Sequence, residues 1–344
     1  MRILKRLLVL ACILAGLGVA AGWLVYTRVQ EPYRAFTSAE QFVDIPPGTG
    51  AAAVGARLAE AGVVRDANTF RVALWFSGRA RELKAGEYRF ERELSPLEVI
   101  DRIARGDVYK RLITFREGLI IPEMARVFEE RGFGPAAEFE RAARNVALVA
   151  DLDPAARDLE GYLFPETYAL PRGTSADELV AQMVGLFKRL YDERLRSEAA
   201  AAGLTTRQVV TLASLVEKET ARPEERPLVG AVYRNRLKVG MGMQADPTVI
   251  YALQHAGRYD GNLSRDDLQF DSPYNTYRYA GLPPGPIASP GLASLVASVR
   301  PAPVSHLYFV SRNDGSHVFA DTLAEHNRNV QEWQVRYFRQ QRRR

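Results

Sequence analysis

The sequence is short of the residues on which several common kinds of site depend. It has one cysteine, Cys12, in 344 residues, which excludes intrachain disulfides and cysteine-based metal sites. Its four histidines show no H-E-x-x-H spacing, so the usual zinc-hydrolase signature is missing. There is also no glycine-rich phosphate loop and no G-x-S-x-G elbow. Carboxylates remain as the side chains for acid–base chemistry.

Positive and negative side chains are also nearly balanced in number. The chain has 46 Lys and Arg against 41 Asp and Glu, a formal net charge of +5. Much of that excess lies at the ends, at Arg2, Lys5 and Arg6 and again at residues 342–344. A nucleic-acid-binding protein more typically has a dense basic stripe with interleaved aromatic residues inside its fold. We therefore expect no nucleic-acid partner, and we expect the basic tails to attract anionic lipid or polymer.

One long run without charge lies near the N-terminus, at residues 7–26. As a helix that rises about 1.5 Å per residue, it spans the roughly 30 Å hydrocarbon core of a membrane. The basic residues within 1–6 should keep that tail in the cytoplasm, which places the chain after Arg28 outside the cytoplasmic (inner) membrane. The alternative is a cleaved signal peptide, whose apolar region is usually shorter, about 7–15 residues.

The next part of the chain predicts a short stalk, residues 27–39, and then a small α+β subdomain, residues 40–110. Ser95, followed by a proline and then Glu98, matches a capping box at the start of a helix. The expected elements are an extended segment at 42–50, helices at 54–61 and 68–76, a strand at 85–90 and a helix from 96 that stops at Gly106. This order resembles a LysM-type carbohydrate-binding module; the alternative is a generic small α+β domain.

Residues 111–344 are expected to form a second, mainly helical domain. A strand at 111–118 and a helix at 122–131 open it, and a stripe of apolar residues predicts one helix over 178–196. Residues 244–291 are dense in Pro, Gly, Tyr, Asn and Asp, and loops of that length more often line a binding cleft. A short hairpin around 313–315 then leads to a final helix.

A helix over residues 206–220 holds the best candidates for chemistry. Its buried stripe is predicted at Val209, Leu212, Ala213 and Val216. At 100° per residue, Glu217 and Glu219 lie about 80° to either side of that stripe. Partial desolvation at the edge of an apolar face raises the pKa of a carboxyl group and makes it a usable general acid. The helix geometry does not choose between the two, and both can equally be ordinary boundary residues.

Several motifs occur together in one order and narrow the function. They are E-G-Y-L-F-P-E-T-Y at 160–168, A-S-L-V-E-K-E-T at 213–220, Q-A-D-P-T-V-I-Y at 244–251, S-P-Y-N-T-Y at 272–277, G-L-P-P-G-P-I-A-S-P-G at 281–291 and H-L-Y-F-V at 306–310. With the apolar run and the LysM-like segment, this set closely resembles the YceG-like family, the endolytic murein transglycosylases. The resemblance covers nearly the whole chain after the apolar run.

The resemblance implies a catalytic glutamate at the first Glu of V-E-K-E, here Glu217. It implies cleavage of the MurNAc–GlcNAc β-1,4 bond within peptidoglycan strands to give 1,6-anhydro-MurNAc ends, without metal or other cofactor. One glutamate can serve, because the substrate's own 6-hydroxyl replaces water as the nucleophile, whereas most glycosidases need two carboxylates. The resemblance also implies that the enzyme works beside peptidoglycan polymerases and limits the length of nascent strands.

Other polar and aromatic residues of the long loops are predicted to bind the glycan. They are Gln244, Asp246, Thr248, Tyr274, Asn275 and Tyr277. Aromatic faces stack on sugar rings, and amides and hydroxyls bind acetamido and hydroxyl groups, although loop scaffolding is the alternative for each. Glu160 and Glu166 are expected to be structural. A wall-binding scaffold without catalysis is the main alternative function, while the apolar run argues against a soluble cytoplasmic enzyme.

Overall fold

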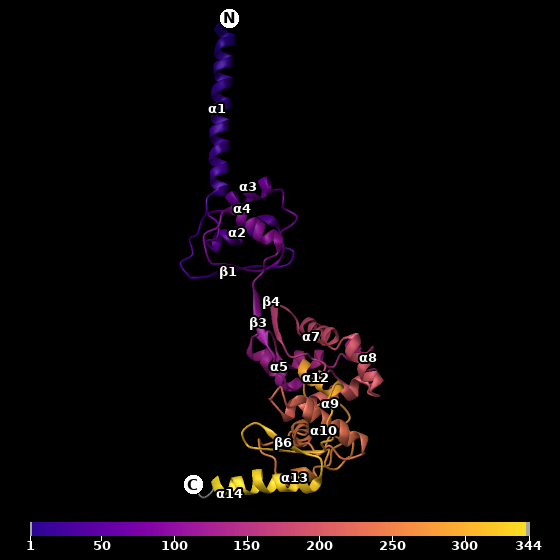
Figure 1. Ribbon diagram of the computed structural model, residues 1–344. Helices are drawn as coiled ribbons and strands as arrows, with labels where there is room; N and C mark the ends of the chain where they lie inside the picture. Colours follow the sequence, from indigo (N-terminus) through magenta and orange to yellow (C-terminus); the bar gives the residue numbers. More distant parts are fainter. Residues whose placement is uncertain (1, 342–344) are drawn as a thin grey trace. The chain divides into compact units, whose positions relative to one another are not determined.

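The computed structural model describes residues 2–341, so Met1 and the arginines at 342–344 of the basic C-terminal tail lie outside the described residues. The chain divides into two compact units. The first runs up to Arg111 and also includes Ala169–Gly173; the second comprises Leu112–Tyr168 and the chain from Thr174 onward. Both mix helices with short strands (Figure 1), so the predicted mixture of helix and strand is confirmed.

The first unit begins with a single long helix, α1 (Arg2–Gln30), drawn in indigo in Figure 1. From Cys12 to Gln30 it is long and apolar enough to cross a membrane. Its apolar side chains face outward: Val19 is 74% exposed and Trp23 66%. At its end, by contrast, Val29 is buried in the core of the first unit. The helix is therefore compatible with a single-pass membrane anchor.

The rest of the first unit follows the order of elements that the sequence predicts. It contains β1 (Gln41–Ile45), α2 (Ala51–Glu60), α3 (Ala67–Ser77), β2 (Gly86–Phe90) and α4 (Pro96–Arg105). The two strands pair antiparallel, with Val43 opposite Tyr88. The capping box that starts α4 is present, because Ser95 N donates to Glu98 Oε2 at 2.7 Å and the Ser95 hydroxyl accepts from Glu98 N. Residues of all five elements fill one apolar core.

The second unit contains most of the helices. Its helices are α5 (Ile121–Glu130), α6 (Ala136–Ala142), α7 (Ala176–Leu190), α8 (Glu193–Ala201), α9 (Thr206–Glu219), α10 (Arg226–Lys238), α11 (Asp246–His255), α12 (Leu292–Val299), α13 (Leu323–Val330) and α14 (Tyr337–Gln341), with short 3₁₀ turns at Val146–Val149 and Asp267–Gln269 and a π-helical stretch at Gln331–Arg336. β3 (Lys110–Thr114) pairs with β4 (Thr167–Pro171), and β5 (Tyr308–Ser311) pairs with β6 (His317–Ala320) in the predicted hairpin. The chain passes between the two units within β3 and β4.

Two sequence predictions for this unit are wrong in detail. The single helix expected over 178–196 is two helices, α7 and α8. They separate because the side chain of Asp192 accepts a hydrogen bond from Leu195 N at 2.8 Å and so caps a new helix. The loop-rich stretch 244–291 also contains a regular helix, α11, which begins at Asp246 with a proline in its first turn.

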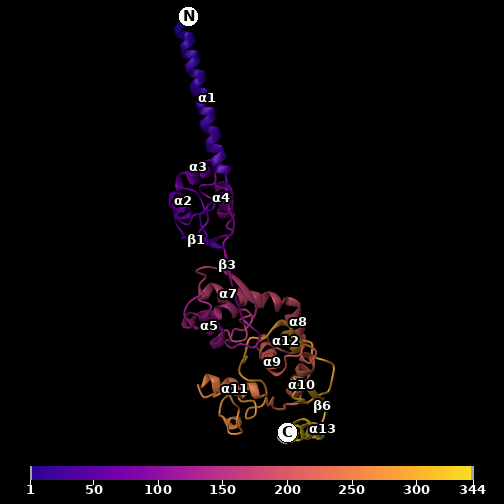
Figure 2. The same cartoon turned by 90° about the vertical axis from the view of Figure 1, so that its left-hand side faces the viewer.

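Helix α9 lies at the centre of the second unit. It packs against α8, α10, α11 and α12, as Figures 1 and 2 show from two sides. Thr205 caps it within a capping box with Gln208, as the sequence predicts. Every residue from 209 to 216 is buried, including Thr211 and Ser214, so the predicted single apolar stripe was too narrow. A helix enclosed on all sides holds the groups at its end firmly in place.

The crossing of α10 and α12 depends on a glycine. A Cβ added at Gly230 would lie 2.6 Å from the carbonyl oxygen of Ala297, whereas one at Gly185 in α7 would meet nothing closer than 3.6 Å. We expect Gly230→Ala to lower the free energy of unfolding by about 1–3 kcal/mol through overpacking. Gly185→Ala, the matched control, should be neutral or stabilising by up to about 1 kcal/mol. Denaturant unfolding of both variants checks this, and equal effects would contradict it.

Candidate active site

Glu217 lies in the last turn of α9, and its carboxylate accepts three hydrogen bonds from two other segments, the starts of α10 and α12. Arg226 Nη2, in the first turn of α10, donates to Oε1 at 2.9 Å. The backbone N–H of Gly291 and the hydroxyl of Ser294, at the start of α12, donate to Oε2 at 3.0 and 2.7 Å. The side chain is only 5% exposed. These contacts hold the carboxylate in one orientation.

A second carboxylate, which the sequence did not single out, lies beside the first. Arg226 Nη2 also contacts Glu117 Oε2, at 3.1 Å. The Glu117 side chain is 46% exposed, far more than the 5% of Glu217. Burial raises the pKa of Glu117, and the negative charge of Glu217 raises it further, while Arg226 opposes both effects.

The turn that carries Glu117 is tied to the rest of the site by its backbone. Gly118 N donates to Ser289 O and Ser289 N to Leu119 O, both at 2.9 Å, as in a short piece of sheet. Lys218, the residue after Glu217, donates from Nζ to Gly118 O at 3.1 Å. The position of Glu117 relative to α9 is therefore fixed by three hydrogen bonds that do not involve its own carboxyl group.

The two carboxylates line an open groove of about 610 Å³ on the second unit. Its lining residues are Thr114, Phe115, Arg116, Glu117, Pro165, Glu166, Thr167, Glu217, Ala221 and Arg226. Of the site residues predicted from the sequence, Glu217 alone lines this groove in the part of the chain that the structure describes. Glu166, expected to be structural, lies on its wall.

Glu219 points to the opposite side of α9, as the helix geometry requires. It accepts a hydrogen bond from the hydroxyl of Tyr233 at 2.7 Å, and desolvation raises the pKa of its carboxyl group. It does not line the groove beside Glu217. The two edges of the helix therefore differ in surroundings, a distinction that the sequence could not make.

The predicted glycan-binding residues fall into two groups. Gln244, Asp246 and Tyr277 are exposed, and the Tyr277 hydroxyl donates to Asp246 Oδ1 at 2.6 Å. Thr248 and Asn275 are buried, the first bonded to Ala245 O and the second to Leu268 O and Phe270 O. In this arrangement the buried pair holds the loop in shape, whereas the exposed three are free to contact a ligand.

Tyr274 is half-buried and lines a small hollow of about 60 Å³ together with Glu160. Its ring lies 4.9 Å from that of Tyr251. Glu160 is 3% exposed, and its Oε2 accepts from Ile121 N at 3.1 Å. Burial raises the pKa of Glu160 from its ordinary 4.5 to about 8.

The raised pKa of Glu160 makes the stability of the fold depend on pH. Between about pH 4.5 and 8 the folded chain holds a proton that the unfolded chain has released, so stability falls as pH rises. At about 1.4 kcal/mol per pKa unit, the free energy of unfolding of the wild type should fall by on the order of 3 to 5 kcal/mol across this range. We expect this fall to be absent in Glu160→Gln. Thermal unfolding from pH 5 to 9 measures it. Glu130→Gln, an exposed control in the same unit, should keep the wild-type slope.

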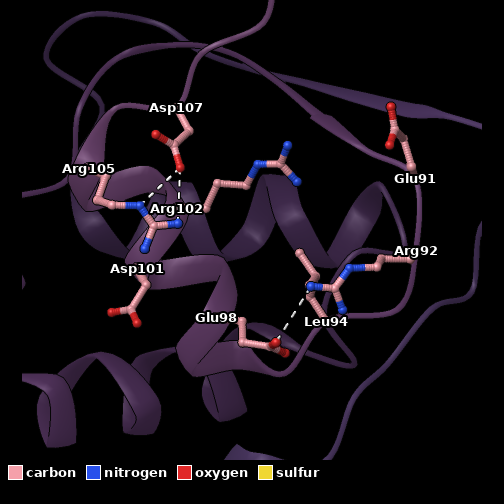
Figure 3. Close-up of a pocket in the computed structure, with 8 residues that line it drawn as sticks. All are labelled: Glu91, Arg92, Leu94, Glu98, Asp101, Arg102, Arg105 and Asp107. Carbon is pink, nitrogen blue, oxygen red and sulfur yellow. Dashed lines mark hydrogen bonds and ion pairs between the residues drawn. The ribbon is translucent and has the colours of Figure 1, made fainter.

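A further hollow, of about 510 Å³, lies on the first unit and is shown in Figure 3. Charged residues around α4 dominate its lining, which comprises Glu91, Arg92, Leu94, Glu98, Asp101, Arg102, Arg105 and Asp107. Arg105 pairs with Asp107 at 3.0 Å, while no dashed line reaches Arg102 in the view. The lining has no aromatic face on which a sugar ring could stack. This hollow is therefore not the basis for a glycan site.

The similarity to known proteins extends over both units of the chain. The model of the YceG-like family matches residues 43–332. An endolytic murein transglycosylase of Bacillus subtilis (strain 168) is 29% identical over 326 residues, covering 90% of this chain and 89% of that protein. One of Streptococcus pneumoniae (strain R6) is 30% identical over 349 residues, 91% of this chain but 62% of that protein. The crystal structure of a YceG-like protein of Listeria monocytogenes has a TM-score of 0.58 and 27% identity, covering 84% of this chain and 98% of that one.

Proposed function

The chain belongs to the YceG-like family, and from that premise we propose that it is an endolytic lytic transglycosylase that cleaves peptidoglycan strands. Two relatives that carry the name endolytic murein transglycosylase support the assignment over about nine tenths of the chain. The observation that carries it is the position of Glu217: a carboxylate at the end of a fully buried helix, fixed by three donors, on the wall of an open groove.

Glu217 serves as the acid and then the base of the proposed reaction. It gives a proton to the oxygen of the MurNAc–GlcNAc β-1,4 bond as the bond from C1 breaks. The 6-hydroxyl of the same muramic acid then attacks C1, and Glu217 takes the hydroxyl proton, leaving a 1,6-anhydro end. No water is consumed. The exposed residues Gln244, Asp246 and Tyr277, and the half-buried Tyr274, are proposed to contact the glycan, while Thr248 and Asn275 shape the loop behind them.

The remaining parts are assigned supporting roles. Helix α1 is proposed to anchor the chain in the cytoplasmic membrane, with residues 1–6 in the cytoplasm, 7–26 in the membrane and the rest outside. Residues 27–39 form the stalk, 40–110 a LysM-like wall-binding module and 111–344 the catalytic domain. In that position the enzyme would cut strands as the polymerases extend them, and so limit their length.

The experiment is an analysis of the products released from peptidoglycan by the purified full chain in detergent. Mass spectrometry separates the possibilities, because hydrolysed ends and anhydro ends differ by one water. Anhydro-muramyl products support the transglycosylase. Hydrolysed products would refute the lytic step, and binding without any cleavage would favour the alternative of a wall-binding scaffold.

A further inference from the structure

The contacts of Glu217 raise a question about the source of its proton. All three partners are positioned as donors, and one of them is a guanidinium that stays charged at any physiological pH. A general acid must carry a proton before it can give one up. A second carboxyl group beside Glu217 could supply that proton.

Glu117 is the neighbour placed to supply it. A single nitrogen, Arg226 Nη2, contacts both carboxylates, at 2.9 Å from Glu217 and 3.1 Å from Glu117. The negative charge of Glu217 disfavours a second charge beside it and so raises the pKa of Glu117, although Arg226 opposes this. Within the described residues, Glu117 accepts from one donor where Glu217 accepts from three, and its side chain is half-exposed to the groove, so it is the better placed of the two to hold a proton.

A close contact with Gly291 fixes the position of the Glu117 carboxyl group beside Glu217. A Cβ added at Gly291 would lie 1.7 Å from Glu117 Oε1, so the carboxyl group of Glu117 rests directly against that glycine. The N–H of the same glycine donates to Glu217. Since Gly291 has an ordinary negative φ of −77°, its backbone conformation does not itself require glycine. The missing side chain makes room for Glu117.

We propose that Glu117 holds the catalytic proton of the resting enzyme and exchanges it with Glu217 during each turnover. The inference rests on the proposed function and adds a positioning residue to it. Glu117 passes its proton to Glu217, which gives it to the leaving oxygen as the C1–O bond breaks. The proton of the attacking 6-hydroxyl goes to Glu217 as the new C1–O bond forms, and returns to Glu117. One proton leaves the pair and one comes back, so the enzyme is unchanged.

The test is the pH dependence of kcat for release of anhydro products by the full chain. We expect Glu117→Gln to lower kcat at pH 7 by about tenfold to a hundredfold, in the range of acid–base effects. KM should change less than threefold. The alkaline limb of the profile should move down by one pH unit or more, because the proton must then sit on Glu217 alone. Glu117→Asp should restore part of kcat and should move the alkaline limb part of the way back toward its wild-type pH. Glu130→Gln, the control, should change neither kcat nor the position of the limb.

A second variant tests the role of Glu117 without changing that residue. Gly291→Ala pushes the carboxyl group of Glu117 away, and should shift the alkaline limb in the same direction. It is the deciding variant if Glu117→Gln does not fold. A wild-type rate and an unmoved limb in either folded variant would overturn the proposal. If Glu117→Gln has normal activity while Glu217→Gln is inactive, the role of Glu117 is contradicted but the proposed function is not. If the wild-type chain releases no anhydro product, the proposed function is contradicted as well.

Discussion

Glu217→Gln should abolish the release of anhydro-muramyl products, with a loss of about a thousandfold or more in kcat at unchanged fold. The glutamine occupies the same volume, and its amide oxygen can still accept from Arg226. It cannot give up or take a proton at neutral pH, so both halves of the proposed reaction lose their acid and base. The measurement is product analysis by mass spectrometry, with circular dichroism to confirm folding.

Glu219→Gln is the matched control for that experiment. It changes the same residue type on the same helix, two positions away, but on the side that faces Tyr233 instead of the groove. We expect its activity to stay within about threefold of the wild type, while its stability should change because the carboxyl group is desolvated. If Glu219→Gln alone stopped product release in a folded chain, the catalytic residue would be on the other edge of α9.

Arg226→Met should give the second largest effect, on both activity and stability. The Arg226 side chain is 11% exposed and is the cation shared by Glu117 and Glu217. Its removal leaves the buried carboxylate of Glu217 without a counter-charge and beside a second carboxyl group. We expect the free energy of unfolding to fall by about 2–4 kcal/mol, because an uncompensated buried charge is costly. Product release should drop by at least about a hundredfold, since Glu217 loses a donor that orients it.

A double variant separates charge from packing in that loss. At pH values above the alkaline limb, where both carboxyl groups are ionised, Arg226→Met combined with Glu117→Gln should recover a large part of the lost stability, because one of the two like charges is gone. Activity should not return, since the proposed proton exchange needs both carboxyl groups. Strictly additive losses in denaturant unfolding would instead mean that Arg226 serves as packing, with no coupling to Glu117.

Local features of the sequence were enough to predict several helix starts and one turn. The helix that ends at Glu219 was predicted to within a residue because its capping box lies within four residues of sequence, at Thr205 and Gln208. The capping box at Ser95 and the turn at 313–315 were predictable for the same reason. The break between α7 and α8 was missed because the apolar stripe continues through Asp192, and only the cap that this side chain forms ends the first helix.

The groove itself could not be predicted in the same way. Glu117, Glu217 and Ser294 are far apart in sequence, and no periodic pattern links them. Helix geometry reduced the catalytic candidates to two glutamates, and the family resemblance chose between them. The neighbouring carboxylate was overlooked because Glu117 was assigned to an ordinary strand and turn. Its place beside Glu217 is seen only from the contacts that Arg226 makes with both carboxyl groups.

The short segment Ala169–Gly173 has a practical consequence for anyone cutting the molecule into pieces. It belongs to the first unit although the chain on both sides of it belongs to the second. Within it, Arg172 pairs with Glu87 at 2.8 Å, and the Glu87 side chain is 5% exposed. A fragment that begins at Leu112 would carry Arg172 without this partner and leave the end of β4 uncovered. A fragment without the membrane anchor should therefore begin just before Val29, which belongs to the core of the first unit, and keep both units together.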